Sequence, residues 1–307
     1  MTTVAFIGLG HMGGPMARSL RAAGHEVRAF DLAPGALDAA RAAGLTVVGS
    51  AAEAATGAEV VITMLPAGRD VVAVYRGTGT KPGALAAASP GTLFVDSSTI
   101  AVEEAHEAHA LAVEAGHRFL DAPVSGGVVG AERGTLAFMV GGDAADVAAV
   151  TPLLEAMGTR VVHCGGPGLG QAAKVCNNMI LGVTQIAVAE AFVLGERLGL
   201  SHQTLFDVAS NATAQCWALT TNCPVPGPVP TSPANRDYEP GFAGALMAKD
   251  LGLAERAIDL VGVEARMGRL AREMYREYAE GEGAHRDFSG IIRTVRDHSN
   301  PTLGEQR

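Results

Sequence analysis

A glycine-rich turn near the N-terminus restricts the fold more than any other feature of the sequence. In VAFIGLGHMGGPMARSL, Gly8, Gly10 and Gly13 follow an apolar strand pattern and precede the pattern of an amphipathic helix. A second strand pattern, HEVRAF, comes next and leads to Asp31, about twenty residues after the turn. This order of elements is typical of a parallel α/β domain that binds a dinucleotide: a strand, a glycine turn, a helix, a second strand and an acidic residue.

Each glycine has its own physical role in such a turn. Gly8 permits the tight backbone turn, Gly10 lets the backbone approach a pyrophosphate, and Gly13 lets the helix pack closely on the strand. The N-terminus of the helix presents free N–H groups to the phosphate oxygens. The residues predicted to contact the dinucleotide here are Gly8, Leu9, Gly10, His11, Met12 and Gly13.

The acid at the end of the second strand predicts the type of dinucleotide. A carboxylate at Asp31 can accept hydrogen bonds from both adenosine ribose hydroxyls, and its charge repels a 2′-phosphate. NAD rather than NADP is therefore the predicted cofactor. Arg28 lies on the preceding strand, where side-chain alternation directs it elsewhere. If Arg28 turned toward the ribose instead, NADP would be tolerated.

The chain divides into two regions of different periodicity. Over residues 1–165, short apolar runs alternate with Ala-rich helical stretches at 35–43, 101–115 and 144–157. This alternation predicts a mostly parallel, doubly wound sheet with helices on both faces. Over 166–307 the period becomes helical, which predicts an all-α region. The helices expected there are a long one over 171–198 and others over 202–210, 245–261, 264–279 and 287–297.

Composition and charge exclude several classes of function. The 307 residues are 48% hydrophobic, and the net charge of -9 disfavours nucleic acid and anionic membranes as partners. The apolar stretch 175–189 is too short and too rich in amides to span a bilayer, and the chain opens into a strand pattern without a basic leader. We therefore expect a cytoplasmic protein. The four cysteines, expected to be small buried or neutral thiols, and the nine histidines show no metal-ligand spacing.

A proline-rich segment interrupts the helical region. Residues 222–240 contain six prolines, which exclude a helix or a central strand. We expect an extended surface loop that is either functional or disordered. Trp217, the only tryptophan, precedes this loop and either forms the wall of a small pocket or belongs to the core.

Candidate ligand contacts lie at the ends of three predicted strands, at the sheet edge where open α/β sheets bind ligands. Leu65 and Pro66 end one strand and Thr99 follows the next, although ordinary turn chemistry would explain these residues equally well. Ser125, Gly126 and Gly127 follow another strand, and their N–H groups with the serine hydroxyl would suit a carboxylate. The alternative for this segment is again a simple strand-to-loop turn.

Lys174 lies in the first turns of the long predicted helix, in GLGQAAKVCNN. Asn178 is four residues further on and shares its face. Desolvation would lower the pKa of this lysine toward the range in which it can accept a proton, as a general base must. The structural alternative is that Lys174 reaches solvent or caps a strand-end carbonyl. Lys249 and Asp250 are adjacent, so they point about 100° apart on a helix, and such neighbours are usually solvated.

Five segments resemble the β-hydroxyacid dehydrogenases in order and spacing, over nearly the whole chain. They are GLGHMGGPMARSLRAAGHEV, VDSST, DAPVSGGVVGAERGTLAFMVGG, GGPGLGQAAKVCNN and GFAGALMAKDLGLA. Cys216 with Trp217, the loop at 222–240 and DFS at 287–289 look most like the branch that acts on 3-hydroxyisobutyrate in valine catabolism. The resemblance implies a Rossmann domain joined by the long helix to a helical domain, and helical domains that pack into a homodimer or homotetramer.

The resemblance also implies roles for individual residues. Lys174 corresponds to the catalytic lysine and Asn178 to an amide that contacts the substrate. Ser125, Gly126 and Gly127 correspond to the segment that holds the substrate carboxylate. The residues implied to contact the cofactor near its reactive end are Leu65, Pro66, Thr99 and Lys249.

The predicted reaction is NAD-dependent oxidation of a small hydroxy acid without a metal. Lys174 withdraws the hydroxyl proton while the carbinol hydrogen leaves as hydride, which would convert 3-hydroxyisobutyrate to methylmalonate semialdehyde. One alternative is a reductase of another small semialdehyde or 3-hydroxy acid, such as tartronate or succinic semialdehyde or glyoxylate. Another is a non-catalytic NAD-binding protein. Relatives often carry small polar residues where Arg69 and Asp70 stand here, so neither is assigned a cofactor contact.

Overall fold

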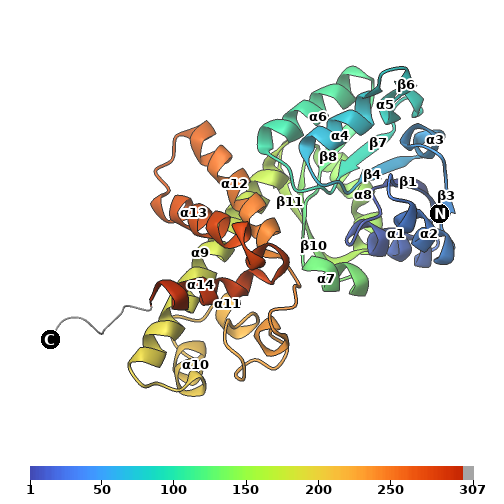
Figure 1. Ribbon diagram of the computed structural model, residues 1–307. Coiled ribbons are helices and arrows are strands. Elements are labelled where there is room, and N and C mark those ends of the chain that lie inside the picture. The colour runs from blue at the N-terminus through green and yellow to red at the C-terminus, as the bar shows by residue number, and fades with distance from the viewer. Residues whose placement is uncertain (300–307) are drawn as a thin grey trace. The chain divides into compact units, whose positions relative to one another are not determined.

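The computed structural model describes residues 1–299, which form two compact units. The first unit is Met1–Lys174 and the second begins at Val175. Helix α9 (Leu169–Arg197) belongs to both, because its first six residues lie in the first unit and the rest in the second (Figure 1).

The first unit contains one large sheet in which all neighbours but two pair in parallel. Its order is β11-β10-β8-β7-β4-β1-β2-β3, and the part from β3 to β8 has the strand order of a Rossmann fold. Only β10 departs, since it pairs antiparallel with β8 and β9. The strands are β1 (Thr3–Ile7), β2 (Glu26–Phe30), β3 (Thr46–Val47), β4 (Val60–Thr63), β7 (Leu93–Asp96), β8 (Arg118–Asp121), β9 (Val124–Ser125), β10 (Leu136–Gly141) and β11 (Gly158–Gly165).

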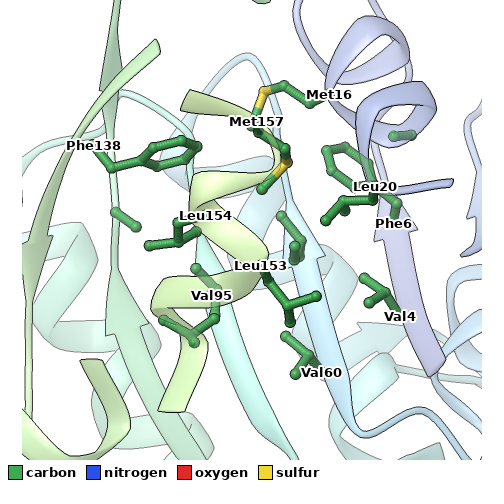
Figure 2. Packing of buried hydrophobic residues seen from close by; sticks show 14 of the residues in the cluster. Val4, Phe6, Met16, Leu20, Val60, Val95, Phe138, Leu153, Leu154 and Met157 are labelled. Atoms are coloured by element: carbon green, nitrogen blue, oxygen red, sulfur yellow. The ribbon is translucent and has the colours of Figure 1, made fainter. Parts of the chain in front are cut away.

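Helices cover both faces of this sheet because successive strand residues point to opposite sides. Phe6 packs with Met16, Leu20 and Leu154 on one face, as Figure 2 shows, whereas Ala5 belongs to the cluster on the other. The helices of this unit are α1 (Gly13–Ala22), α2 (Pro34–Ala42), α3 (Ala51–Ala55), α4 (Gly68–Arg76), α5 (Ala84–Ala87), α6 (Val102–Glu114), α7 (Gly127–Arg133) and α8 (Ala144–Glu155). A short hairpin, β5 (Gly77–Thr78) with β6 (Lys81–Pro82), follows α4.

The second unit is helical, as the periodicity predicts. Its core contains Phe192, Met247, Tyr275 and Phe288. Besides α9 it consists of α10 (His202–Ser210), α11 (Trp217–Thr220), α12 (Gly244–Val261), α13 (Arg266–Glu280), α14 (Ile291–His298) and the 3₁₀ turns η1 (Pro233–Arg236), η2 (Glu282–His285) and η3 (Phe288–Gly290). The expected fold, a Rossmann-type sheet followed by an all-helical domain with a long helix between them, is confirmed.

Residues 175–189 are predicted from the sequence to be too short to span a membrane, but this argument is wrong for the whole helix α9. The helix has 29 residues, and an 18-residue window of mean hydropathy 1.5 makes it long and apolar enough to cross a bilayer. A single helix of this kind is weak evidence for a membrane span, and 44% of that window is buried inside the protein. The polar residues Gln171, Asn178 and Gln185 are buried as well.

The proline-rich segment is not the extended surface loop that its composition suggests. Its apolar residues alternate with prolines, and Cys223, Val225 and Tyr238 belong to the core of the second unit. The segment folds back on itself, since Ser232 Oγ donates to the carbonyl of Cys223 at 2.5 Å and the Tyr238 hydroxyl to that of Pro224 at 2.7 Å. Side chains thus satisfy backbone groups that prolines leave without ladder partners.

Candidate active site

The glycine turn has the backbone geometry that the sequence predicts. Gly8 has a positive φ of 96°, and a Cβ there would lie 2.3 Å from the carbonyl oxygen of Met64. A Cβ at Gly13 would lie 1.9 Å from the carbonyl oxygen of Gly8, so α1 begins against the turn. Gly10 is exposed with nothing within 4 Å of its Cβ position. The turn therefore has open space at the residue predicted to approach a pyrophosphate, beside an exposed His11 and a half-buried Met12.

Asp31 follows β2 directly and is tied to the glycine turn. Its carboxylate accepts the N–H of Leu9 at 2.6 Å through Oδ2 and that of Ala33 at 2.7 Å through Oδ1. Each oxygen keeps a further lone pair, so hydroxyls of a ribose can still bind. Arg28 is held elsewhere, by Glu26 at 3.0 Å and the carbonyl of Thr56 at 2.6 Å. The guanidinium of Arg28 is therefore bonded away from the end of β2, where the Asp31 carboxylate keeps acceptor capacity.

A buried aspartate organises the ends of β4 and β7. Asp96 Oδ1 accepts the hydroxyl of Thr63 at 2.7 Å and that of Ser98 at 2.6 Å. Ser98 Oγ in turn accepts the N–H of Leu65 at 2.8 Å. The turn that carries Leu65 and Pro66 is thereby fixed to the turn that carries Thr99.

Burial raises the pKa of Asp96 to about 6, although the hydrogen bonds from Ser98 and Thr63 oppose the shift. Its second oxygen, Oδ2, is buried and has no hydrogen-bond partner among residues 1–299. Protonation is easier than for an exposed carboxyl group for this reason, because an ionised carboxylate needs more hydrogen bonds than Asp96 receives.

A second buried aspartate, at the end of β8, contacts the start of α9. Asp121 Oδ1 accepts the N–H of Gly168 at 2.7 Å, and Oδ2 accepts that of Gln171 at 2.8 Å. Burial raises the pKa of Asp121, and these backbone N–H groups oppose the shift. The carboxylate thus satisfies two of the N–H groups that a helix N-terminus leaves unpaired.

The side chain of Gln171 joins the same helix to the Thr99 turn. Its Nε2 donates to the carbonyl of Ser98 at 2.7 Å, and its Oε1 accepts the N–H of Ile100 at 3.2 Å. Both neighbours of Thr99 are therefore held by one buried amide. This connection lies wholly in the first unit.

The segment predicted to hold a substrate carboxylate lies between β9 and α7. The apolar run HRFLDAPV at 117–124 does not form one continuous strand, because β8 ends at Asp121 and β9 pairs with β10 in the opposite sense. Pro123 explains the break because it has no N–H to donate to the sheet. Ser125 ends β9, and Gly126 and Gly127 follow with φ of 133° and 62°.

Lys174 and Asn178 lie one turn apart on α9, as predicted, and both are buried. Lys174 is 6% exposed, which contradicts the alternative of a side chain that reaches solvent. Asn178 is 2% exposed, and its Nδ2 donates to Asp250 Oδ2 at 2.5 Å. Asp250 is 5% exposed, so the expectation of a solvated Lys249–Asp250 pair is wrong for the aspartate. Lys249 is half-buried on α12.

Sequence reasoning missed the polar residues that hold the candidate site in place. They are Thr63, Asp96, Ser98, Asp121, Gln171 and Asp250. One signal for the first unit was available, because Thr63, Asp96 and Asp121 are the last residues of three neighbouring parallel strands. For Asp250, the signal was its spacing from Met247, Ala254 and Ile258, which places it on the buried face of α12.

The remaining polar candidates lie apart from these contacts. Trp217 is not a core residue, since it is 51% exposed, and it stacks on the buried Phe288. The four cysteines are free thiols; Cys223 is buried, with a pKa raised to about 11 by burial, whereas Cys176 is exposed. Within residues 1–299, no group of three or more His, Cys, Asp or Glu could hold a metal ion.

Comparison with known proteins identifies the family. Residues 3–166 match the model of the NAD binding domain of 6-phosphogluconate dehydrogenase. Residues 168–295 match the model described as NAD-binding of NADP-dependent 3-hydroxyisobutyrate dehydrogenase. Together the two matches cover both units described above.

Similar proteins span nearly the full length of the chain. A probable 3-hydroxyisobutyrate dehydrogenase of Mycobacterium tuberculosis is 57% identical over 96% of this chain and 98% of its own. The NAD-dependent L-serine dehydrogenase of Pseudomonas aeruginosa is 46% identical over 99% of this chain and 100% of its own. A solved structure of Mycobacterium tuberculosis 3-hydroxyisobutyrate dehydrogenase with L-serine has a TM-score of 0.92 and 57% identity, covering 96% of this chain and 99% of that one. The chain therefore belongs to the 3-hydroxyisobutyrate dehydrogenase family of NAD-binding oxidoreductases, and the resemblance inferred from the sequence is confirmed.

Proposed function

We propose that the protein oxidises 3-hydroxyisobutyrate to methylmalonate semialdehyde with NAD, as a step of valine catabolism. The observation that carries the proposal is the burial of Lys174, which is 6% exposed and one helical turn from Asn178 on α9. An amine withdrawn from water is the group that can exchange a proton with an alcohol near neutral pH.

Each predicted site residue has a role in this proposal. The substrate carboxylate binds at Ser125–Gly127, where a hydroxyl and backbone N–H groups follow a strand end. Lys174 takes the hydroxyl proton, and Asn178 contacts the substrate. Leu65, Pro66, Thr99 and Lys249 contact the nicotinamide half of the cofactor, and residues 8–13 with Asp31 bind the adenosine diphosphate half. Bound NAD supplies the hydride acceptor.

The same residues serve the reverse direction. As an ammonium, Lys174 can donate a hydrogen bond to an aldehyde oxygen and stabilise the charge that develops on it. Reduction of another small semialdehyde is therefore compatible with this chemistry, and the identity of the group beside the hydroxymethyl carbon decides between substrates.

Oxidation of L-serine is the second candidate. Two of the similar proteins carry L-serine in their names, one as substrate and one in a solved structure. L-Serine has the same carboxylate and the same primary alcohol as 3-hydroxyisobutyrate, but an ammonium replaces the methyl group. Recognition of the ammonium would require an additional acceptor, so the two substrates differ in the polar contacts they need.

A substrate panel distinguishes these candidates. We expect NAD-linked oxidation of (S)-3-hydroxyisobutyrate to have a higher kcat/KM than oxidation of L-serine, 3-hydroxypropionate or glycerate. The variant Lys174→Ala should lose about 10²–10⁴-fold in kcat because its proton acceptor is gone, while it still binds NAD. Lys81→Ala, which changes an exposed lysine of the β5–β6 hairpin, is the matched control and should retain activity. A higher kcat/KM for L-serine, or near-normal turnover in Lys174→Ala, would contradict the proposal.

The assembly and location of the enzyme are also proposed. Exposed apolar side chains on the second unit, among them Leu194 and Leu198, support a homodimer or homotetramer formed by helical domains. The net charge of -9 supports the absence of nucleic acid and membrane partners. We expect the enzyme to act in the cytoplasm.

A further inference from the structure

We propose that Asp121, together with Gln171, is a positioning residue that sets the location of Lys174 relative to the turns around the substrate and nicotinamide. The inference rests on the proposed catalytic role of Lys174. It concerns contacts made within the first unit, between the ends of β4, β7 and β8 and the first turns of α9.

The N-terminus of α9 has no cap of its own. A helix is usually capped by a Ser, Thr, Asp or Asn side chain at the residue before its first turn, which accepts an N–H from two or three residues further on. Gly168 occupies that place here and has no side chain. Asp121 supplies the missing acceptor from 47 residues away, with one oxygen on the N–H of Gly168 and the other on the N–H of Gln171.

The surrounding backbone leaves room for this contact. A Cβ at Gly170 would lie 2.7 Å from the Asp121 carbonyl oxygen and 2.8 Å from its Oδ2. Asp121 is fully buried, and its negative charge lies at the positive end of a 29-residue helix. A larger residue at position 170 would separate the carboxylate from the helix. The glycines of the GLGQ segment therefore allow the end of β8 to lie against the start of α9.

Gln171 extends the contact to the nicotinamide side. Its amide holds Ser98 and Ile100, and Ser98 Oγ accepts the N–H of Leu65. A continuous set of hydrogen bonds therefore links Asp121, the first turn of α9 and both turns assigned to the nicotinamide. Lys174 comes three residues after Gln171, within one helical turn.

Loss of the Asp121 cap should affect the rate more than cofactor binding. Without its acceptors the first turn of α9 frays, and the backbone that carries Lys174 shifts. A shift of about 1 Å in a reacting group can lower a rate about 10²-fold. Asp31 is held by the N–H groups of Leu9 and Ala33, which the substitution leaves in place, so residues 8–13 and Asp31 should still bind the adenosine half of NAD.

The test compares Asp121→Asn with wild type in the full-length enzyme. Asparagine keeps the size of the side chain, but its NH₂ group faces one of the two N–H donors. We expect kcat for hydroxy acid oxidation to fall about 10²-fold while the KM for NAD stays within about threefold. Hydrogen exchange at Gln171 and the residues after it should become faster in the variant.

Two further variants make the result specific. Gln171→Met removes the hydrogen bonds to Ser98 and Ile100 but keeps the contact between Asp121 and the backbone of α9. It should therefore lower kcat by a smaller factor than Asp121→Asn. If Asp121→Asn does not fold, Gln171→Met takes its place as the test. Asp287→Asn removes a comparable buried carboxylate in the second unit, which accepts N–H groups of Gly241, Phe242 and Ser289. It should lower Tm without changing hydrogen exchange at the start of α9.

Normal kcat in both Asp121→Asn and Gln171→Met would overturn the inference, even if exchange became faster, because the contact would then be structural only. Failure of the proposed function gives a different result. In that case wild type itself would oxidise none of the four hydroxy acids or would prefer L-serine, or Lys174→Ala would keep near-normal turnover, and none of these outcomes depends on Asp121.

Discussion

Three buried aspartates receive hydrogen bonds from three different kinds of donor. Asp121 is bound by backbone N–H groups, and Asp250 accepts the side-chain amide of Asn178. Asp96 receives hydroxyl groups on one oxygen only. Because a buried charge needs nearly all of its hydrogen-bonding capacity filled, Asp96 is the one whose ionisation should cost stability.

The pKa of Asp96 predicts a pH dependence of stability. Its pKa is about 6 in the folded protein, above the ordinary value of 3.8, so the folded state binds the proton more tightly than the unfolded chain does. The contribution of this proton is therefore complete below about pH 4 and is lost as the pH rises to about 6. At 1.36 kcal/mol for each pKa unit, the loss amounts to about 3 kcal/mol.

The measurement is the free energy of unfolding of wild type and Asp96→Asn between pH 4 and pH 8. The amide cannot ionise, so the variant should gain about 3 kcal/mol relative to wild type over this range. Thr63→Val removes a hydroxyl that opposes the shift, and it should make the loss of stability with rising pH larger. A constant difference between wild type and Asp96→Asn at every pH would contradict the prediction.

Asp31 predicts the choice between the two nicotinamide dinucleotides. The carboxylate is held at the end of β2 by the N–H groups of Leu9 and Ala33, so it cannot easily turn away from a ribose phosphate. Like charges in such contact cost several kcal/mol, which corresponds to a preference for NAD of about 10²-fold or more in kcat/KM.

Kinetics with both cofactors check this preference. Asp31→Asn removes the charge and keeps an acceptor, and it should reduce the ratio of the two kcat/KM values mainly by improving the use of NADP. Asp38→Asn, a change of an exposed carboxylate on α2 that pairs with Arg41, should leave the ratio unchanged. Equal efficiency of wild type with NAD and NADP would show that Asp31 does not select the cofactor.

At the scale of elements, periodicity predicted most of the fold. The long helix expected over 171–198 is α9, and β1, β2 and β4 lie where apolar runs predicted strands. Such elements are encoded locally, because one side-chain pattern repeats over many residues. The break between β8 and β9 and the short helix α7 were missed, since Pro123 lies inside an apolar run and α7 contains two glycines.

The candidate site was predictable in part. The glycine turn with Asp31, and Lys174 with Asn178, are recognisable because their members lie on one short segment or at a fixed helical spacing. The supporting contacts join residues far apart in the sequence, such as Asp121 with Gly168 and Asn178 with Asp250. Local periodicity contains no information about such pairs, so only a folded backbone can bring them together.

At the scale of the whole molecule, apolar surface on the second unit remains to be explained. Ile180 and Leu194 on α9 and Leu198, the residue directly after it, are 61%, 61% and 73% exposed, and we call these three residues the α9 stripe. They follow one another at helical spacing with Ala187 and Ala191, which are also exposed, so they form one face. Exposed apolar surface of this kind is typical of protein interfaces.

The α9 stripe predicts that self-association depends on α9. Burial of a leucine side chain stabilises an interface by about 1.5–3 kcal/mol, and a glutamate in its place would also bury a charge. Wild type should therefore have a mass in solution of two or four times 31.3 kDa, whereas the double variant Leu194→Glu/Leu198→Glu should dissociate toward the monomer. Sedimentation over a range of concentrations measures both masses.

Val113→Glu serves as the control, because it places a glutamate at an apolar residue of α6 in the first unit that is 53% exposed. It should keep the wild-type mass if helical domains form the interface. If Val113→Glu caused dissociation instead, the interface would lie on the Rossmann domain. A wild-type protein that sediments as a monomer at every concentration would leave the α9 stripe without a role in self-association, because apolar side chains that stay in water contribute no interface free energy.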